Sequence, residues 1–270
     1  MTNSKIKNQF LTIATPTNNG MVHTEYLQSL MGTHYLLKAN VYTENCKIGN
    51  LIAEGISNIV KGRDDLLNQW YYEIPESNYF MWIDSDMGWN AEDVFKLWKY
   101  RLPLIAGAGS RKFINWNDVK KVVNDRATNN PNEIMPIASR YCSHTLTKST
   151  PFSNVYKTNY IGTAFMMLTR ELINKMFKFY GKDKDLQFDF KNKHKGLALH
   201  KPLIVNGQYL GEDYSFCERV RKINEKVLID TSVKLKHIGR YVWEGDCDLH
   251  LKKHPKYKNS EQINLDNFNI

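Results

Sequence analysis

The sequence has no long hydrophobic run. No stretch of its 270 residues approaches the roughly 18 consecutive apolar residues that a membrane-spanning helix needs. Residues 1–5 carry no apolar segment like that of a signal peptide. We therefore expect no membrane span and a cytoplasmic location.

Cysteines are also few. Cys46, Cys142, Cys217 and Cys247 are scattered, without the short paired spacings of a zinc site. We expect them to be reduced and structural. Hydrophobic residues nevertheless make up 42% of the chain and aromatic residues 12%, which is enough for a large buried core and excludes a disordered chain.

Positive charge exceeds negative charge. Lysine and arginine number 37 against 28 acidic residues, a formal net charge of +9. This balance favours a polyanionic partner through counterion release. The density is highest over 182–201 and in the tail, at Lys182, Lys184, Lys191, Lys193, Lys195, Lys201, Lys252, Lys253, Lys256 and Lys258. A polyanion contact and a solvated basic surface both account for it.

Strand-like and helical patterns alternate along the first half. The predicted strands cover 10–14, 35–42, 79–83 and 103–107. The predicted helices cover 22–31, 51–59, 64–72 and 90–98. This order predicts an α/β fold with a mostly parallel central sheet flanked by helices and joined by right-handed connections.

The second half is less regular. Residues 117–133 are polar and predict a surface flap, and 181–201 predict a long basic loop. Further elements are a strand over 160–168, helices over 169–179 and from Gly211, and a strand over 226–230. We expect a single domain over 1–246, made of one half at about 1–116 and another at about 117–246, and a C-terminal extension over 247–270.

The most informative motif is Asp84-Ser85-Asp86, directly after the apolar run 79–83. A buried strand that ends at two carboxylates presents them at a sheet edge, where ligands collect in open α/β folds. Such carboxylates suit a hard divalent cation that keeps open positions for phosphate oxygens. The motif therefore points to chemistry on a nucleotide diphosphate, although a solvated turn gives the same pattern.

An ordered set of motifs resembles the GT-A fold glycosyltransferases, in the small soluble form found in bacteria, phages and large DNA viruses. The matching segments, which span Phe10 to about Asp246, are 13–17 (IATPT), 62–64 (GRD), 82–87 (WIDSDM), 107–112 (GAGSRK), 161–166 (IGTAFM), 211–217 (GEDYSFC) and 235–239 (LKHIG). Asp64 departs from the asparagine that is usual in the family. The resemblance implies a Rossmann-like GT-A sheet and a UDP-sugar donor, with 1–116 as the donor half and 117–246 as the acceptor half. For a viral member of the family, the expected location is the host cytoplasm.

The resemblance also implies a metal site. Asp86 would bind Mn²⁺ or Mg²⁺ directly, while Asp84 would touch the ribose or reach the metal through water. His237 would be the third protein ligand, since an imidazole suits manganese. The metal would stabilise the charge that develops on the departing UDP. A packing role is the alternative for His237.

Catalysis would fall on Asp213 and Glu212. The acceptor hydroxyl must lose a proton as it attacks the anomeric carbon, and Asp213 is the candidate general base. Glu212 would orient the acceptor beside it. A base at this position favours inversion. The alternative is that both carboxylates only cap a helix.

The other donor contacts would come from both halves. Thr15 and Pro16 would present backbone groups to the uracil, and Arg63 would reach the base or the diphosphate. Ser85 would contact the donor from the metal-binding turn. Arg111 and Lys112 would hold phosphate or line the acceptor cleft, and a plain surface position is the alternative for both. Gly162 and Thr163 would approach the donor sugar through their backbone atoms.

The acceptor stays open between two classes. Hydroxymethylated pyrimidines in DNA would suit a basic protein with interleaved aromatic and lysine side chains over 188–195, and a protein or growing glycan is the other class. Two further functions compete: a nucleotidyltransferase acting on a sugar phosphate, and a non-catalytic sugar-binding module. Against the first, residues 15–20 (TPTNNG) lack the basic residues of a triphosphate-binding loop.

Overall fold

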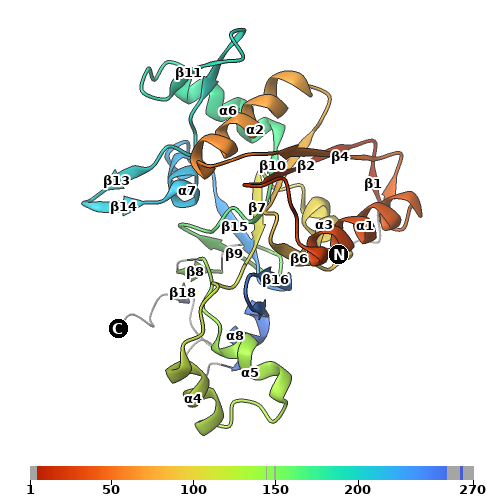
Figure 1. Ribbon diagram of the computed structural model, residues 1–270, viewed down its shortest axis with the longest axis vertical. Helices are drawn as coiled ribbons and strands as arrows, with labels where there is room; N and C mark the ends of the chain where they lie inside the picture. Colours follow the sequence, from red (N-terminus) through yellow and green to blue (C-terminus); the bar gives the residue numbers. More distant parts are fainter. Residues whose placement is uncertain (1–4, 144, 149, 254–261, 264–270) are drawn as a thin grey trace.

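The computed structural model describes residues 5–143, 145–148, 150–253 and 262–263 (Figure 1). Its strands are β1 (Ile6–Lys7), β2 (Phe10–Pro16), β3 (Thr43–Glu44), β4 (Lys47–Ala53), β5 (Tyr79–Ile83), β6 (Met87–Trp89), β7 (Leu104–Gly107), β8 (Leu146–Thr147), β9 (Val155–Thr158), β10 (Phe165–Thr169), β11 (Gln187–Phe190), β12 (His194–Leu197), β13 (Leu203–Val205), β14 (Gln208–Leu210), β15 (Val227–Asp230), β16 (Leu235–Ile238), β17 (Val242–Gly245) and β18 (Gln262–Ile263). Its helices are α1 (Thr24–Lys38), α2 (Ile59–Glu73), α3 (Ala91–Tyr100), α4 (Trp116–Asn124), α5 (Pro131–Ala138), α6 (Arg170–Tyr180), α7 (Glu212–Lys222) and α8 (Cys247–Lys253).

One nine-stranded sheet organises the molecule, in the order β18-β8-β9-β15-β7-β10-β5-β2-β4. β2 is parallel to both β4 and β5, and β7 is parallel to β15. β10 lies between β5 and β7 and is antiparallel to both. β4, β2, β5, β7 and β15 therefore point the same way, and the predicted α/β fold with a mostly parallel central sheet is confirmed.

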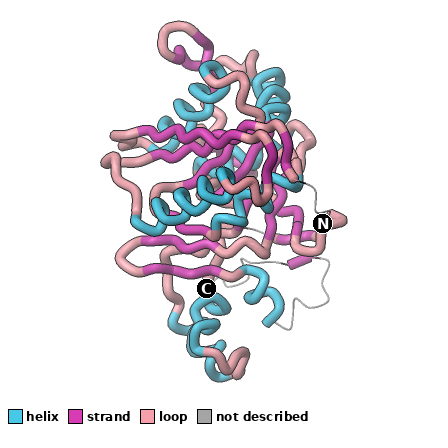
Figure 2. Tube along the Cα trace, turned by 90° about the vertical axis from the view of Figure 1, so that its right-hand side faces the viewer, coloured by secondary structure: helices cyan, strands magenta, loops and turns pink. Residues whose placement is uncertain are grey.

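Helices cover both faces of this sheet, as the side view shows (Figure 2). The reason lies in strands such as β5, which are apolar at every position and buried on both sides. Phe80 and Trp82 join the core beneath α2, α6 and α7. Met81 and Ile83 join the core beneath α1 and α3. The strand is thereby held from both faces up to the residue before Asp84.

A smaller cluster lies at one end of the molecule, where α4, α5 and α8 pack together (Figure 1). Val122, Ile137 and Ala138 form its buried centre. The prediction of a polar flap over 117–133 is wrong, because its apolar residues give α4 and the start of α5 an inward face. The tail contributes α8, and β18 pairs with β8. Lys256 and Lys258 lie outside the described residues.

Three other expectations for the elements were wrong. The segment 35–42 is not a strand, because α1 continues to Lys38. The segment 51–59 is not a helix, because β4 pairs with β2 up to Ala53. The expected loop over 181–201 contains the antiparallel hairpin of β11 and β12. In the part of the chain that the structure describes, no helix is long and apolar enough to cross a membrane.

Candidate functional site

The Asp84-Ser85-Asp86 triplet forms the turn between β5 and β6. The backbone N–H of Asp84 donates to the carbonyl of Ala164 at the start of β10 (3.1 Å), and the N–H of Met87 closes the turn on the carbonyl of Asp84 (3.1 Å). Both carboxylates are about a quarter exposed, at 24% and 27% of their side-chain surface. The sequence folds here as predicted, with a rigid strand that ends at two accessible acids.

A buried arginine holds the first of these acids. Arg63, on α2, is 3% exposed, and its Nη2 donates to both oxygens of Asp84 at 2.9 Å. The guanidinium carbon lies 5.3 Å from the centre of the Trp82 ring, and Nε is 3.9 Å from Oε1 of Glu212 on α7. Arg63 therefore connects α2 and the turn after β5 to the start of α7.

The second acid faces two cationic or basic groups. Lys112 donates to Oδ2 of Asp86, and Nε2 of His237 lies 3.7 Å from Oδ1. Pairing of β16 with β6 brings His237 opposite Met87, beside the turn. The other ring nitrogen of His237, Nδ1, is 2.7 Å from the carbonyl of Ser110. Because a carbonyl only accepts, Nδ1 carries a proton, and Nε2 is the ring nitrogen that faces Asp86.

These groups fit a divalent cation in part. Carboxylate oxygen and imidazole nitrogen are suitable ligands for Mn²⁺, and Asp86 and His237 offer one of each on facing atoms. Among the described residues, no group of three or more histidine, cysteine or acidic side chains is arranged to hold a metal. Asp84 faces Arg63 instead. A metal held by two protein ligands would take its remaining ligands from water and phosphate oxygens, a common arrangement for magnesium sites.

Asp213 lies in the first turn of α7, next to Glu212. Burial, with the negative charge of Glu212 adding to it, raises the pKa of Asp213 to about 6. The backbone N–H of Tyr214 donates to Oδ1 (2.7 Å). A Cβ added at Gly162 would lie 3.7 Å from Oδ2 and 3.2 Å from the Cβ of Cys142. Gly162 thus leaves room beside the carboxylate that the sequence singled out as a base.

The remaining predicted donor residues line the same edge of the sheet. Thr15 and Pro16 end β2, and Oγ1 of Thr15 is 2.6 Å from the hydroxyl of Tyr26. The pKa of Tyr26 is raised by burial and, to a smaller extent, by the charge of Asp84. Thr163 is 1% exposed and precedes Ala164, whose carbonyl binds Asp84.

Arg63 and Thr163 carry buried polar atoms without a hydrogen-bond partner among the described residues. In the described part of the chain, Nε and Nη1 of Arg63 and Oγ1 of Thr163 make no hydrogen bond. Buried donors of this kind are costly, and those in native proteins generally serve a ligand, an ion or water. The predicted donor side therefore has unused hydrogen-bonding capacity, which fits a polar ligand.

The structure places Cys142 at the site, which the sequence did not predict. Burial raises the pKa of Cys142 to about 11, Arg111 opposes this shift, and the charges of Asp213 and Asp84 add to it. Cys142 therefore lies among the site residues as a neutral thiol. Its N–H donates to the carbonyl of Gly109 (3.1 Å), which fixes it beside the loop after β7. No local pattern marks it, because its neighbours come from distant segments.

Comparison with known proteins gives distant likenesses. No protein-family model and no curated protein matches the chain. The structure of A197 from STIV matches 88% of this chain and 94% of that chain, at 13% identity and a TM-score of 0.45. A glycosyltransferase involved in the glycosylation of the major capsid of PBCV-1 matches over 82% and 91%, at 11% identity and a TM-score of 0.29.

S. aureus TarS (residues 1–349) matches over 83% of this chain and 57% of that chain, at 14% identity and a TM-score of 0.36. With each of these TM-scores below 0.5, the likenesses assign the chain to no family.

Proposed function

We propose that this protein is a metal-dependent glycosyltransferase of the GT-A type, which moves a hexosyl or pentosyl group from a UDP-sugar to an acceptor hydroxyl. The observation that carries the proposal is the convergence of four acids with Arg63 at one sheet edge. Arg63 contacts Asp84 and approaches Glu212, and Asp213 follows Glu212 directly. Donor-binding and proton-accepting groups would thereby share one site.

The proposed donor contacts come from Arg63, Thr163, Thr15 and Pro16. Arg63 would donate from Nε and Nη1 to oxygens of the nucleotide, and Thr163 would donate its hydroxyl. The backbone at the end of β2 would face the uracil. Lys112 now binds Asp86 and would turn toward the phosphates when the donor enters, since an ammonium group binds phosphate as a point charge.

Asp86 and His237 would hold the cation, with Asp84 contributing through the ribose or a bridging water. The bound cation would stabilise negative charge on the leaving diphosphate. Nδ1–H of His237 donates to the carbonyl of Ser110, which would keep Nε2 available as a ligand. Lys112 would balance part of the charge of Asp86 in the absence of the donor.

Asp213 would act as the general base. A pKa of about 6 leaves the carboxyl mostly ionised at pH 7 and yet more basic than an ordinary aspartate. It would accept the proton of the acceptor hydroxyl as the new glycosidic bond forms, with inversion at the anomeric carbon. Glu212 would orient the acceptor and keep Asp213 basic through its negative charge.

The acceptor is proposed as either DNA with hydroxymethylated pyrimidines or a protein or glycan. Phe113 and Trp116 follow Lys112 on the chain and are 51% and 70% exposed. Aromatic faces of this kind stack on nucleobases and on the apolar face of sugar rings. They fit both acceptor classes, so the acceptor must be identified by experiment.

A nucleotidyltransferase acting on a sugar phosphate would use similar carboxylates, and its product separates the two reactions. We expect UDP release from one nucleotide sugar in the presence of Mn²⁺. Pyrophosphate release from a nucleoside triphosphate would identify the alternative reaction. Binding of a sugar without either product would identify a binding module.

The central test is Asp86→Ala in that UDP-release assay. We expect metal-dependent release to be lost while the melting temperature stays close to wild type, because Asp86 is partly exposed and contributes little to the core. Asp248→Ala, an acid on α8 ion-paired with Lys252, is the matched control and should keep full activity. Undiminished release by Asp86→Ala would remove the triplet from the site.

A further inference from the structure

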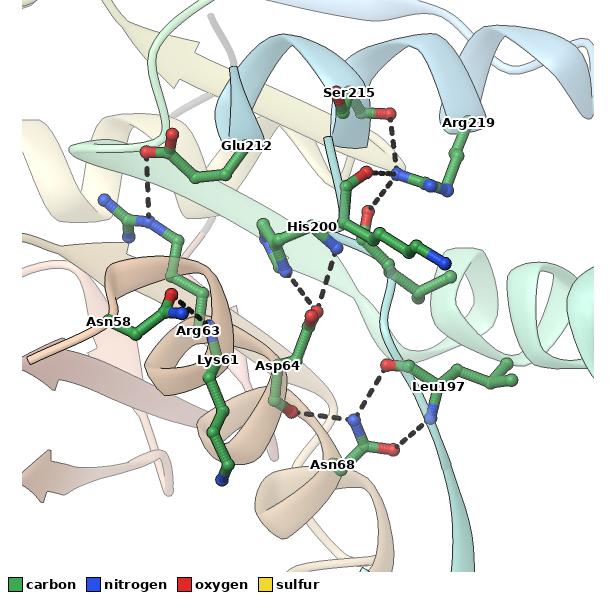
Figure 3. A network of polar contacts seen from close by, with 12 residues as sticks. Asn58, Lys61, Arg63, Asp64, Asn68, Leu197, His200, Glu212, Ser215 and Arg219 are labelled. Carbon is green, nitrogen blue, oxygen red and sulfur yellow. Dashed lines mark hydrogen bonds and ion pairs between the residues drawn. The ribbon is translucent and has the colours of Figure 1, made fainter. Parts of the chain in front are cut away.

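The segment 197–201 lies between two helices that carry site residues. It begins at the last residue of β12 and leads to β13, with α2 on one side and α7 on the other (Figure 3). α2 carries Arg63, and α7 begins with Glu212 and Asp213. The contacts that attach this segment to both helices therefore help to set the distance between the proposed donor contacts and the proposed base.

Contacts from α2 hold one side of the segment. Oδ1 of Asp64 accepts from the backbone N–H of His200 (2.9 Å) and from Nδ1 of its ring (2.8 Å). One turn further along the helix, Asn68 accepts from the N–H of Leu197 (2.9 Å) and donates to its carbonyl (3.0 Å). Four hydrogen bonds thus attach 197–200 to the same helix face as Asp64.

Contacts from α7 hold the other side. Nη1 of Arg219 donates to the carbonyls of Leu199 (3.0 Å) and Lys201 (2.7 Å). The ring of His200 stacks on Phe216 with centroids 4.7 Å apart and an angle of 8° between the planes. His200 therefore contacts both helices at once, through its nitrogen to α2 and through its face to α7.

These contacts are deeply buried. His200 is 0% exposed, Arg219 2% and Asp64 3%. Burial lowers the pKa of His200, so its ring is neutral, and the carboxylate of Asp64 fixes the remaining proton on Nδ1. Nε2 has no partner within the described residues. A buried polar group held in one tautomer and one orientation gives a rigid link, because any other arrangement loses bonds that water does not replace.

We propose that Asp64 and His200 are positioning residues that hold α7 against α2, and so hold Asp213 in register with Arg63. This inference rests on the proposed glycosyl transfer. A base acts only when it lies within hydrogen-bond reach of the hydroxyl, and a displacement of about 1 Å can lower turnover by about 10²-fold. The link explains why buried polar groups lie behind the site instead of an apolar contact.

The test uses the full chain with four substitutions. Asp64→Ala removes both bonds to His200, and His200→Phe keeps a ring against Phe216 but loses the Nδ1 bond. Asp64→Asn retains an acceptor oxygen for both N–H groups. Thr12→Val is the matched control, because it deletes a buried hydrogen bond to Ser77 (2.8 Å) at the other end of β2.

We expect a split between turnover and donor binding. In Asp64→Ala and His200→Phe, kcat for UDP release should fall about 10- to 100-fold while KM for the donor stays within about threefold, since Arg63 and the metal-binding turn remain. Asp64→Asn should recover kcat to within about fivefold of wild type. A purely structural role predicts a lower melting temperature and an unchanged kcat below it, as we expect for Thr12→Val.

Hydrogen exchange gives a readout that needs no activity. The amides of 213–217 should exchange faster in Asp64→Ala and His200→Phe than in wild type, while those of α6 stay unchanged. Folded Asp64→Ala and His200→Phe with kcat within twofold of wild type would overturn the positioning role. If the wild-type protein releases no UDP, the proposed function fails separately, and unchanged exchange would then overturn the link as well.

Discussion

At the scale of single residues, Asp213 makes the sharpest prediction. Asp213→Asn keeps the shape of the side chain and removes its ability to accept a proton. We expect donor binding to be retained and turnover to fall by about 10²-fold or more, the size of a missing general base. Isothermal calorimetry with the UDP-sugar and the UDP-release assay measure the two effects. Glu218→Gln, on the same helix and paired with Arg221, is the control. A parallel loss of binding and turnover would identify Asp213 as a helix cap.

The same substitution has a defined effect on stability. The pKa of Asp213 is raised to about 6 in the folded state, mainly by burial. Its contribution to the free energy of unfolding is therefore fully present below about pH 4 and is lost as the pH rises through 6. A shift of about two units corresponds to at most about 3 kcal/mol. Asp213→Asn should accordingly melt higher than wild type at pH 8, with the gain vanishing near pH 4. An equal difference at both pH values would contradict the shifted pKa.

The residues of the site were predictable to the extent that each ends a strand or begins a helix. Asp84 and Asp86 follow an apolar strand, and Asp213 opens a helix, so each was visible in its own segment. The cationic side chains with which these acids pair could not be predicted from the sequence. Arg63 on Asp84 and Lys112 on Asp86 depend on how α2 and the loop after β7 pack, and Cys142 enters the site only through the fold.

At the scale of elements, the predictions for 35–42 and 51–59 were wrong because apolar side chains in these segments are exposed to solvent. β4 is at the edge of the sheet and has no fully buried residue, so Ile52 is 47% exposed and the run from Leu51 resembles a helix face. The last turns of α1 carry Tyr35, Leu36 and Leu37 in a row, which resembles a strand, although Tyr35 is 71% exposed. The central strands have no such ambiguity, because both faces are buried.

The close packing at the end of β7 can be tested with one methyl group. A Cβ at Gly107 would lie 2.6 Å from Cγ1 of Val233 and 3.2 Å from Phe165, which is too close without a shift. We expect Gly107→Ala to lower the free energy of unfolding by about 1–3 kcal/mol, the usual cost of overpacking. Gly109→Ala is the control, since its methyl group would meet only Met87 at 3.7 Å. Chemical denaturation compares the two. Equal free energies of unfolding for both variants would show that the packing around Gly107 adjusts to a methyl group at little cost.

At the scale of the whole molecule, the net charge of +9 is spread unevenly. The hairpin of β11 and β12 projects beside α2 and α6 (Figure 1) and carries Lys191, Lys193 and Lys195. Lys191 pairs with Glu73 (2.5 Å), and Lys195 pairs with Asp189. The stacking of Tyr72 on His194, with centroids 4.1 Å apart, fixes the hairpin against α2. Part of its charge is thus balanced locally, on a rigid support.

The acidic partners of these lysines reduce the affinity that the hairpin would contribute to binding a DNA acceptor. Each phosphate contact changes the slope of log K against log salt by about 0.9. If hydroxymethylated DNA binds here, replacing Lys191, Lys193 and Lys195 with Ala should flatten the slope by one to about three units, with the smaller value expected because two of these lysines already have acidic partners. Lys7, Lys38 and Lys47, which are exposed on β1, α1 and β4, provide the triple control. Fluorescence anisotropy across a salt series measures both. An unaltered slope would show that these lysines form only a solvated surface. A wild-type protein that releases UDP without binding DNA would favour a protein or glycan acceptor.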